Sequence, residues 1–144
     1  NRKLMSSTMI LLNELNRVLI LETTYKEHWE VPGGGIEGDE SPLEAVIRET
    51  REEIGLTIKE PKLIVVDYRH TQEQKEEMVH LVFFGGVIKK SDENKIILQA
   101  DEIKAYKFAT LVEALELTGP GIGQRIRRAM KAINSNTCIY WDIV

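Results

Sequence analysis

The sequence predicts an α+β domain in which a mixed β-sheet is covered by helices on both faces. Three features indicate this fold class: short apolar runs separated by turn residues, one helix with clear end signals between the strands, and two further helices after them. The 144 residues are 42% hydrophobic and 29% charged, which suits a soluble domain with one core. We therefore expect residues 1–144 to form a single domain.

The first elements of the chain are expected to be paired strands. Met9–Leu12 and Val18–Leu21 are β-branched and leucine-rich runs, and the polar residues 13–17 between them suit a hairpin. Trp29–Val31 is a third extended piece. It runs into Pro32–Gly35, where the proline and three glycines predict a loop because they stop regular pairing.

A helix is predicted over Pro42–Ile54. Ser41 is suited to cap its amino-terminal end, and Glu44 completes a capping box three residues later. Proline is favoured at the first position of a helix, and Gly55 is suited to end this one.

The second half of the chain is expected to contain two long strands, a short strand and two helices. The charged link 71–77 and the polar turn 89–94 are too polar to be buried, so both should face water. The expected strands are Ile58–Tyr68, Met78–Ile88 and Lys104–Phe108, and the expected helices are one capped by Thr110 with Glu113 and one over Ile122–Ile133.

Composition and charge exclude several classes of protein. The longest apolar runs fall well short of the roughly 18 to 20 residues that a membrane helix needs, so no membrane span is expected. The formal net charge of −4 disfavours nucleic acid as the main partner. The single cysteine, Cys138, cannot form an internal disulfide, which points to a reducing compartment such as the cytoplasm. The sequence leaves a homodimer open.

Three carboxylates gather on one face of the predicted helix. Glu49, Glu52 and Glu53 lie at positions i, i+3 and i+4, so their like charges repel and also meet the negative end of the helix dipole. A divalent cation would reverse both costs, and oxygen ligands favour Mg²⁺ or Mn²⁺. The alternative is a salt-bridged surface in which Arg48 pairs with Glu52 and with Glu44 at helical spacing.

The 23 residues from Gly34 to Leu56 resemble the Nudix box. That pattern has glycine, five residues, glutamate, seven residues, then arginine-glutamate, an aliphatic residue, any residue, two glutamates, any residue, glycine and an aliphatic residue. This chain departs from the pattern only at the first aliphatic position, which Thr50 occupies. We expect the Thr50 hydroxyl to bond back to the Val46 carbonyl. The residues in register are Gly34, Glu40, Arg48, Glu49, Glu52, Glu53, Gly55 and Leu56.

The resemblance implies a Nudix-like α/β/α sandwich and a hydrolase activity. Nudix enzymes use water and a divalent metal to split a phosphoanhydride in a nucleoside diphosphate linked to another group. By this resemblance Glu49, Glu52 and Glu53 would hold Mg²⁺ or Mn²⁺ together with a backbone carbonyl near Gly33. A carboxylate that is not bound to metal would take the proton from the attacking water, and Arg48 would orient the glutamates.

Other residues are weaker candidates for the same site. Glu40 would brace the loop or bind a second metal through water, and Gly34 and Gly35 would let the loop approach the substrate closely. Glu102 lies where several Nudix enzymes carry an extra metal-binding or catalytic glutamate, and a solvated loop acid is the alternative. Tyr68 and Arg69 could meet the substrate from a strand end or simply reach water. The basic residues of the last helix are expected to form a solvated face, with a phosphate or RNA contact as the alternative: Arg125, Arg127, Arg128 and Lys131.

The sequence narrows the substrate only in part. Patterns that mark hydrolases of NADH, coenzyme A or ADP-ribose are absent, which leaves nucleoside triphosphates and nucleotide sugars open. Two alternatives remain: a Nudix-fold module that binds a nucleotide or a protein without cleaving it, and an enzyme that processes RNA 5′ ends. The first usually loses a glutamate of the box, whereas this chain keeps all of them.

Overall fold

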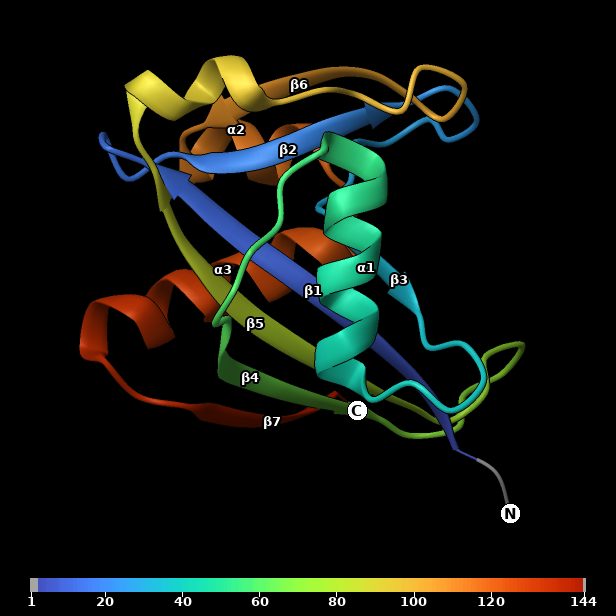
Figure 1. Cartoon of the computed structure of the whole chain (residues 1–144). Helices are drawn as coiled ribbons and strands as arrows, with labels where there is room; N and C mark the ends of the chain where they lie inside the picture. Colours follow the sequence, from blue (N-terminus) through green and yellow to red (C-terminus); the bar gives the residue numbers. More distant parts are fainter. Residues whose placement is uncertain (1–2, 144) are drawn as a thin grey trace.

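The computed structural model describes residues 3–143 and has one seven-stranded mixed sheet (Figure 1). The strand order is β6-β2-β1-β5-β4-β7, and β3 pairs with β1 off this path. In chain order the elements are β1 (Leu4–Asn13), β2 (Val18–Thr23), β3 (Gly33–Gly35), α1 (Pro42–Ile54), β4 (Lys62–Arg69), β5 (Met78–Ile88), the 3₁₀-helix η1 (Lys90–Lys95), β6 (Ile103–Ala109), α2 (Leu111–Leu117), α3 (Pro120–Ser135) and β7 (Ile139–Ile143).

Strand β1 is at the centre of the sheet. It runs parallel to β5 and antiparallel to both β2 and β3. On the far side of β5, β4 is antiparallel to β5 and parallel to β7, while β6 pairs antiparallel with β2. The sheet is therefore mixed, as the sequence predicts.

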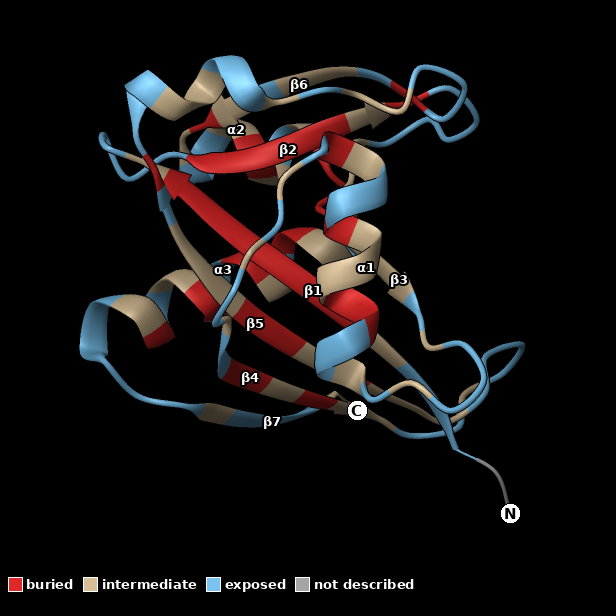
Figure 2. Ribbon diagram, viewed as in Figure 1, coloured by how far each residue is buried: buried red, intermediate tan, exposed pale blue. Residues whose placement is uncertain are grey.

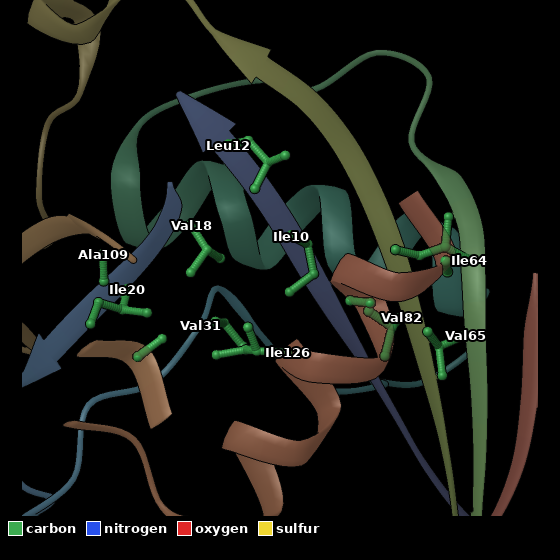
Figure 3. Packing of buried hydrophobic residues seen from close by; sticks show 13 residues of the cluster. Ile10, Leu12, Val18, Ile20, Val31, Ile64, Val65, Val82, Ala109 and Ile126 are labelled. Carbon is green, nitrogen blue, oxygen red and sulfur yellow. The ribbon is translucent and has the colours of Figure 1, made fainter. Parts of the chain in front are cut away.

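The two faces of the sheet bury separate hydrophobic clusters, because successive strand residues point to opposite faces. In β1, Met9 and Leu11 pack with Val46 of α1, whereas Ile10 and Leu12 pack on the side of α2 and α3. Figure 3 shows the second cluster, in which Ile126 of α3 belongs to the same core as the strand residues. Figure 2 shows β1 buried along most of its length and the outer side of α1 exposed. Helices therefore cover both faces.

Helix α1 begins and ends where its local signals predict. The Glu44 N–H donates to Ser41 Oγ at 3.1 Å, and the Ser41 N–H donates to Glu44 Oε1 at 3.0 Å, which together form the capping box. At the other end Gly55 adopts a left-handed φ of 76°, and its N–H donates to the Arg51 carbonyl. These caps fix the helix whose second half carries the glutamates.

The prediction of a loop over Pro32–Gly35 is wrong for its three glycines. Gly33, Gly34 and Gly35 form β3 and pair with Thr8, Ser7 and Ser6 of β1. Backbone hydrogen bonds need no side chain, so a glycine run can join a sheet wherever a neighbouring strand offers a free edge. As a result the box loop is held by the sheet at its start.

Other boundaries differ by a few residues. The strand predicted from Ile58 begins at Lys62, the turn at 89–94 is the 3₁₀-helix η1, and Trp29–Val31 makes only isolated bridges, including Leu21 to Glu30. Strand β7 was not predicted, because its five residues mix polar and apolar side chains and its partner β4 is distant in sequence. Within residues 3–143, no helix is long and apolar enough to cross a membrane.

Candidate active site

Glu53, in the last turn of α1, is bound by the backbone of β3. The Gly33 N–H donates to Glu53 Oε1 at 2.9 Å. Gly33 has a φ of 140°, and a Cβ atom there would collide with the Ser7 carbonyl oxygen and lie 2.8 Å from Thr8 Cα. Only glycine fits such a position without strain, so this residue places its N–H against the carboxylate.

Glu49, one turn earlier on the same face, lies against the next glycine. A Cβ atom at Gly34 would be 3.2 Å from both Cδ and Oε1 of Glu49, so a larger residue would push the carboxylate away. A Cβ atom at Gly35 would meet nothing within 4 Å. Of the three glycines, Gly33 and Gly34 are therefore the two that shape the surroundings of the glutamates.

The glutamate cluster disfavours negative charge. Burial raises the pKa of Glu53 to about 8, and the negative charges of Glu49, Glu102 and Glu30 add to this increase, while the Gly33 hydrogen bond lowers it. Burial also raises the pKa of Glu49 above its usual range. The structure thus brings Glu102, predicted from outside the box, close enough to affect Glu53.

Arg48 connects the acidic residues of the box. Its guanidinium donates two hydrogen bonds to Glu40, at 2.7 and 3.0 Å, and one each to Glu49 and Glu52 at 3.2 Å. The hydrogen bond from Arg48, followed by one from the Glu37 N–H, lowers the pKa of Glu40 to about 2. Glu40 is therefore in position to brace the loop against α1.

The salt-bridged surface considered as the alternative is present only in part. The Arg48–Glu52 pair forms at 3.2 Å with helical i, i+4 spacing. Glu44 does not pair with Arg48, because its carboxylate accepts the Ser41 N–H in the capping box. Since Arg48 binds Glu40, Glu49 and Glu52 together, it serves the whole loop and helix rather than one surface pair.

The loop that carries Glu102 is attached to the end of α1. The Ile97 N–H donates to the Ile54 carbonyl at 2.9 Å, and the Gln99 N–H donates to the Glu53 carbonyl at 3.0 Å. The Glu102 carbonyl in turn accepts the Thr24 N–H at 2.9 Å. These backbone bonds fix the loop beside the glutamates, although the Glu102 residue itself is exposed.

The carboxylate groups of the box suit a hard divalent cation. Within the part of the chain described, no three His, Cys, Asp or Glu side chains are already gathered as a metal-binding group. The carboxylates of Glu49 and Glu52 instead accept hydrogen bonds from Arg48. The carboxylates nevertheless supply only oxygen ligands, and the mutual repulsion of Glu49 and Glu53 is the cost that a cation would remove.

Two other predicted site residues lie elsewhere. Tyr68 packs edge-on against His70 with ring centroids 4.7 Å apart, and Arg69 donates to the Glu76 carbonyl at 3.0 Å. Neither lines the pocket that contains Glu53. The structure therefore does not bring Tyr68 and Arg69 to the glutamates.

The expected hydrogen bond from Thr50 to Val46 is absent, and that prediction is wrong. Thr50 is fully buried, and its Oγ1 has no hydrogen-bond partner among the described residues. A buried hydroxyl without a hydrogen bond is a cost to folding at this position.

The prediction of a solvated basic face on the last helix is wrong for two of its residues. The side chains of Arg125 and Arg128 are only 13% and 12% exposed, because both point toward the buried carboxylate of Asp67 in β4. Arg127 and Lys131 are exposed, as expected. Sequence spacing could not find this cluster, since Asp67 lies far from α3 in the chain.

Known proteins are similar to this chain in both sequence and fold. The family model described as "NUDIX domain" matches residues 3–129. A MutT-like protein of Streptomyces ambofaciens is 33% identical over 123 residues, which cover 78% of this chain and 77% of that protein. An RNA pyrophosphohydrolase of Halorhodospira halophila is 46% identical over 48 residues, 33% of this chain. That match spans about a quarter (26%) of the relative's own length.

The fold agrees with solved structures as well. The crystal structure of a MutT protein from Methanosarcina mazei Go1 superposes with a TM-score of 0.72 at 22% identity, over 94% of this chain and 96% of the other. This likeness confirms the predicted Nudix-like α/β/α sandwich. Because the family model matches most of the sequence, the chain belongs to the Nudix family.

Proposed function

We propose that this Nudix hydrolase is a divalent-metal-dependent pyrophosphohydrolase. It would cleave a phosphoanhydride bond in a nucleoside diphosphate linked to another group, of the nucleoside triphosphate or nucleotide sugar type. Membership of the Nudix family supports action on phosphorus-containing anhydrides. The finer points, which are Mg²⁺ or Mn²⁺ dependence and the substrate class, are our proposal.

One observation supports the proposal most strongly. The carboxylates of Glu49 and Glu53 both lie against glycines of β3. Burial raises the pKa of Glu53, and the nearby negative charge of Glu102 raises it further. Carboxylates are rarely gathered and partly buried without a compensating charge. A bound cation and its phosphate substrate would supply that compensation.

Each residue then has a proposed task. Glu49, Glu52 and Glu53, with the Gly33 carbonyl, would hold the metal, which when bound neutralises diphosphate oxygens and lowers the pKa of water. One of the glutamates takes the proton from the attacking water.

The surrounding residues support the glutamates. Arg48 positions Glu49 and Glu52 through its hydrogen bonds, and Glu40 holds Arg48 in place. Gly34 and Gly35 keep the approach to the metal open, and Glu102 adds a further carboxylate beside Glu53. A part for Tyr68 and Arg69 in substrate binding stays a prediction.

A second candidate is the processing of RNA 5′ ends. A relative named as an RNA pyrophosphohydrolase, matched over a third of this chain, favours it. The net charge of −4 disfavours a long RNA partner, so we rank it below small nucleotides. We also propose the cytoplasm as the compartment, and we leave homodimer formation open.

A metal-supplemented substrate panel tests the proposal. The panel contains nucleoside triphosphates, ADP-ribose, sugar nucleotides, dinucleoside polyphosphates, 5′-triphosphate RNA and capped RNA, with products identified by mass. We expect hydrolysis of at least one class by the wild type, and a loss of at least about a hundredfold in kcat for Glu53→Gln and Glu52→Gln. No turnover with any compound, alongside binding of some, would instead favour a module that binds without cleaving.

A further inference from the structure

The pocket that contains Glu53 has a second charged wall, supplied by α3. Arg125 of α3 and Glu53 of α1 line the same cavity, whose volume is about 140 Å³. Glu53 belongs to the Nudix box, whereas Arg125 lies well outside it in sequence. The cavity therefore joins the proposed metal-binding wall to a cation that the box does not provide.

The positive charge of Arg125 is not balanced by a hydrogen-bonded anion. Asp67 uses both of its oxygens for Arg128, accepting from Nε at 2.9 Å and from Nη2 at 2.6 Å. Arg125 Nε is 3.8 Å from Asp67 Oδ2, and it is buried with no hydrogen-bond partner among the described residues. A buried donor without an acceptor is costly unless a ligand completes it.

Two other charged residues at this pocket, Lys26 and Glu30, are already hydrogen-bonded to each other. Glu30 accepts a hydrogen bond from Lys26 at 2.7 Å, which leaves Glu30 less available to Arg125. Burial lowers the pKa of Arg125, and the nearby Arg128 and Arg69 lower it further, while Asp67 and Glu30 oppose this effect. The guanidinium thus lies where an additional anion would be stabilised.

The remaining lining is rich in hydroxyl groups. Ser7, Thr8 and Thr23 all line the cavity, and Ser7 Oγ is a second buried polar atom with no hydrogen-bond partner among residues 3–143. Pockets that hold whole small-molecule ligands are lined mainly by hydrophobic and aromatic side chains, whereas here Val31 and Tyr25 are outnumbered by polar and charged residues. Arginine and hydroxyl donors instead suit the oxygens of a phosphoryl group, which a guanidinium can bind through two N–H donors.

We propose that Arg125 and Ser7 bind a phosphoryl group of the substrate adjacent to the diphosphate that lies against the glutamates. A cavity of about 140 Å³ is smaller than the roughly 300 to 1,000 Å³ of whole-ligand pockets, so it takes one small group. The cleft then selects substrates with three or more linked phosphoryl groups over diphosphate sugars. This inference rests on the proposed function and specifies its substrate class.

Equilibrium binding of methylene analogues, which cannot be hydrolysed at the replaced bridges, tests this selection apart from turnover. The titrations use the full chain with Mg²⁺ and compare a nucleoside triphosphate analogue with the matching nucleoside diphosphate analogue. The proteins are the wild type, Arg125→Gln, Arg125→Lys and the control Arg127→Gln, which removes an exposed arginine from the same helix. Asp67 keeps both bonds to Arg128 in each variant, so the fold should be retained, as thermal melting will verify.

We expect Arg125→Gln to weaken the triphosphate analogue at least about tenfold and to change the diphosphate analogue less than about twofold. Arg125→Lys should lose less, because it keeps the charge, and Arg127→Gln should match the wild type. Equal losses for both analogues, or no loss, would overturn the inference; if Arg125→Gln fails to fold, the same comparison with Arg125→Lys decides. An Arg125-dependent preference without any hydrolysis would refute the proposed function and leave this inference standing.

Discussion

Glu53 is the residue in which burial, charge and backbone geometry meet. Its carboxylate accepts the Gly33 N–H at 2.9 Å and is surrounded by the negative charges of Glu49, Glu102 and Glu30. The box pattern places Glu49 and Glu53 on one helical face from the sequence alone. Their contact with β3 and with the Glu102 loop depends on distant pairing, which no local pattern reports.

Glu102 is the proposed site residue whose role the box does not predict. Glu102→Gln should reduce kcat with little change in melting temperature, because the side chain is exposed and packs little. Asp101→Asn, next to it on the same exposed loop, is the matched control and should be nearly silent. Steady-state kinetics on both variants provide the test, and equally small effects would return Glu102 to a solvated loop acid.

Thr50 offers a stability test at the one position that departs from the box pattern. Thr50→Val removes a fully buried hydroxyl that has no hydrogen-bond partner among the described residues, while keeping the shape of the side chain. The free energy of unfolding should rise by about 1 kcal/mol in urea titrations. Thr118→Val is the control. The Thr118 hydroxyl donates to the Ala114 carbonyl at 2.6 Å, so its removal should lower the free energy of unfolding. A gain only at Thr118 would contradict this view of Thr50.

At the scale of elements, β3 determines how the loop of the box approaches α1. Gly33→Ala should cost at least about 2 kcal/mol of unfolding free energy and lower kcat, because a Cβ atom would collide with β1 and shift the N–H from Glu53. Gly35→Ala is the control, since its Cβ would meet nothing within 4 Å, and it should stay within about 0.5 kcal/mol of the wild type. Similar stabilities for the two variants would show that β3 is not held this tightly.

The contrast between α1 and β3 shows what the sequence can predict. Both ends of α1 were predicted correctly because Ser41, Glu44 and Gly55 act within one turn of the helix. Strands β3 and β7 were missed, since their pairing depends on β1 and β4, which lie elsewhere in the chain. The same reason explains why Arg125 was expected in solvent: only the folded sheet brings it to Asp67.

At the scale of the whole molecule, the face of the sheet covered by α3 buries a charged cluster beside the proposed site. His80 of β5 is paired across the sheet with Asp67 of β4, and its Nδ1 is 2.5 Å from Ser6 Oγ. Burial lowers the pKa of His80 to about 3, and the positive charges of Arg125, Arg69 and Arg128 contribute to that decrease. The fold therefore favours a neutral His80.

A pH dependence of stability follows from this arrangement. The unfolded chain binds a proton at His80 near pH 6.5 and the folded chain does not until about pH 3, so the contribution of His80 to stability is full above the unfolded pKa and falls as the pH is lowered. Between about pH 6.5 and pH 5 the loss should approach about 1.4 kcal/mol per pH unit. Glu53, with a folded pKa of about 8, contributes the opposite slope over this range, so the test is the difference in unfolding free energy between the wild type and His80→Gln in urea titrations, which should change by that amount per pH unit. Parallel profiles would show that His80 is not kept neutral.

The central claim is that the glutamates of α1 act through a divalent cation on a phosphoanhydride. The most direct measurement is the rate of product release from the best substrate of the panel with Mg²⁺, then with excess chelator, and finally with Mg²⁺ restored. The account predicts that the wild-type rate falls to background in chelator and returns when Mg²⁺ or Mn²⁺ is added in excess, while Glu53→Gln is at least about a hundredfold slower than the wild type whenever the metal is present. An undiminished rate in excess chelator would contradict it.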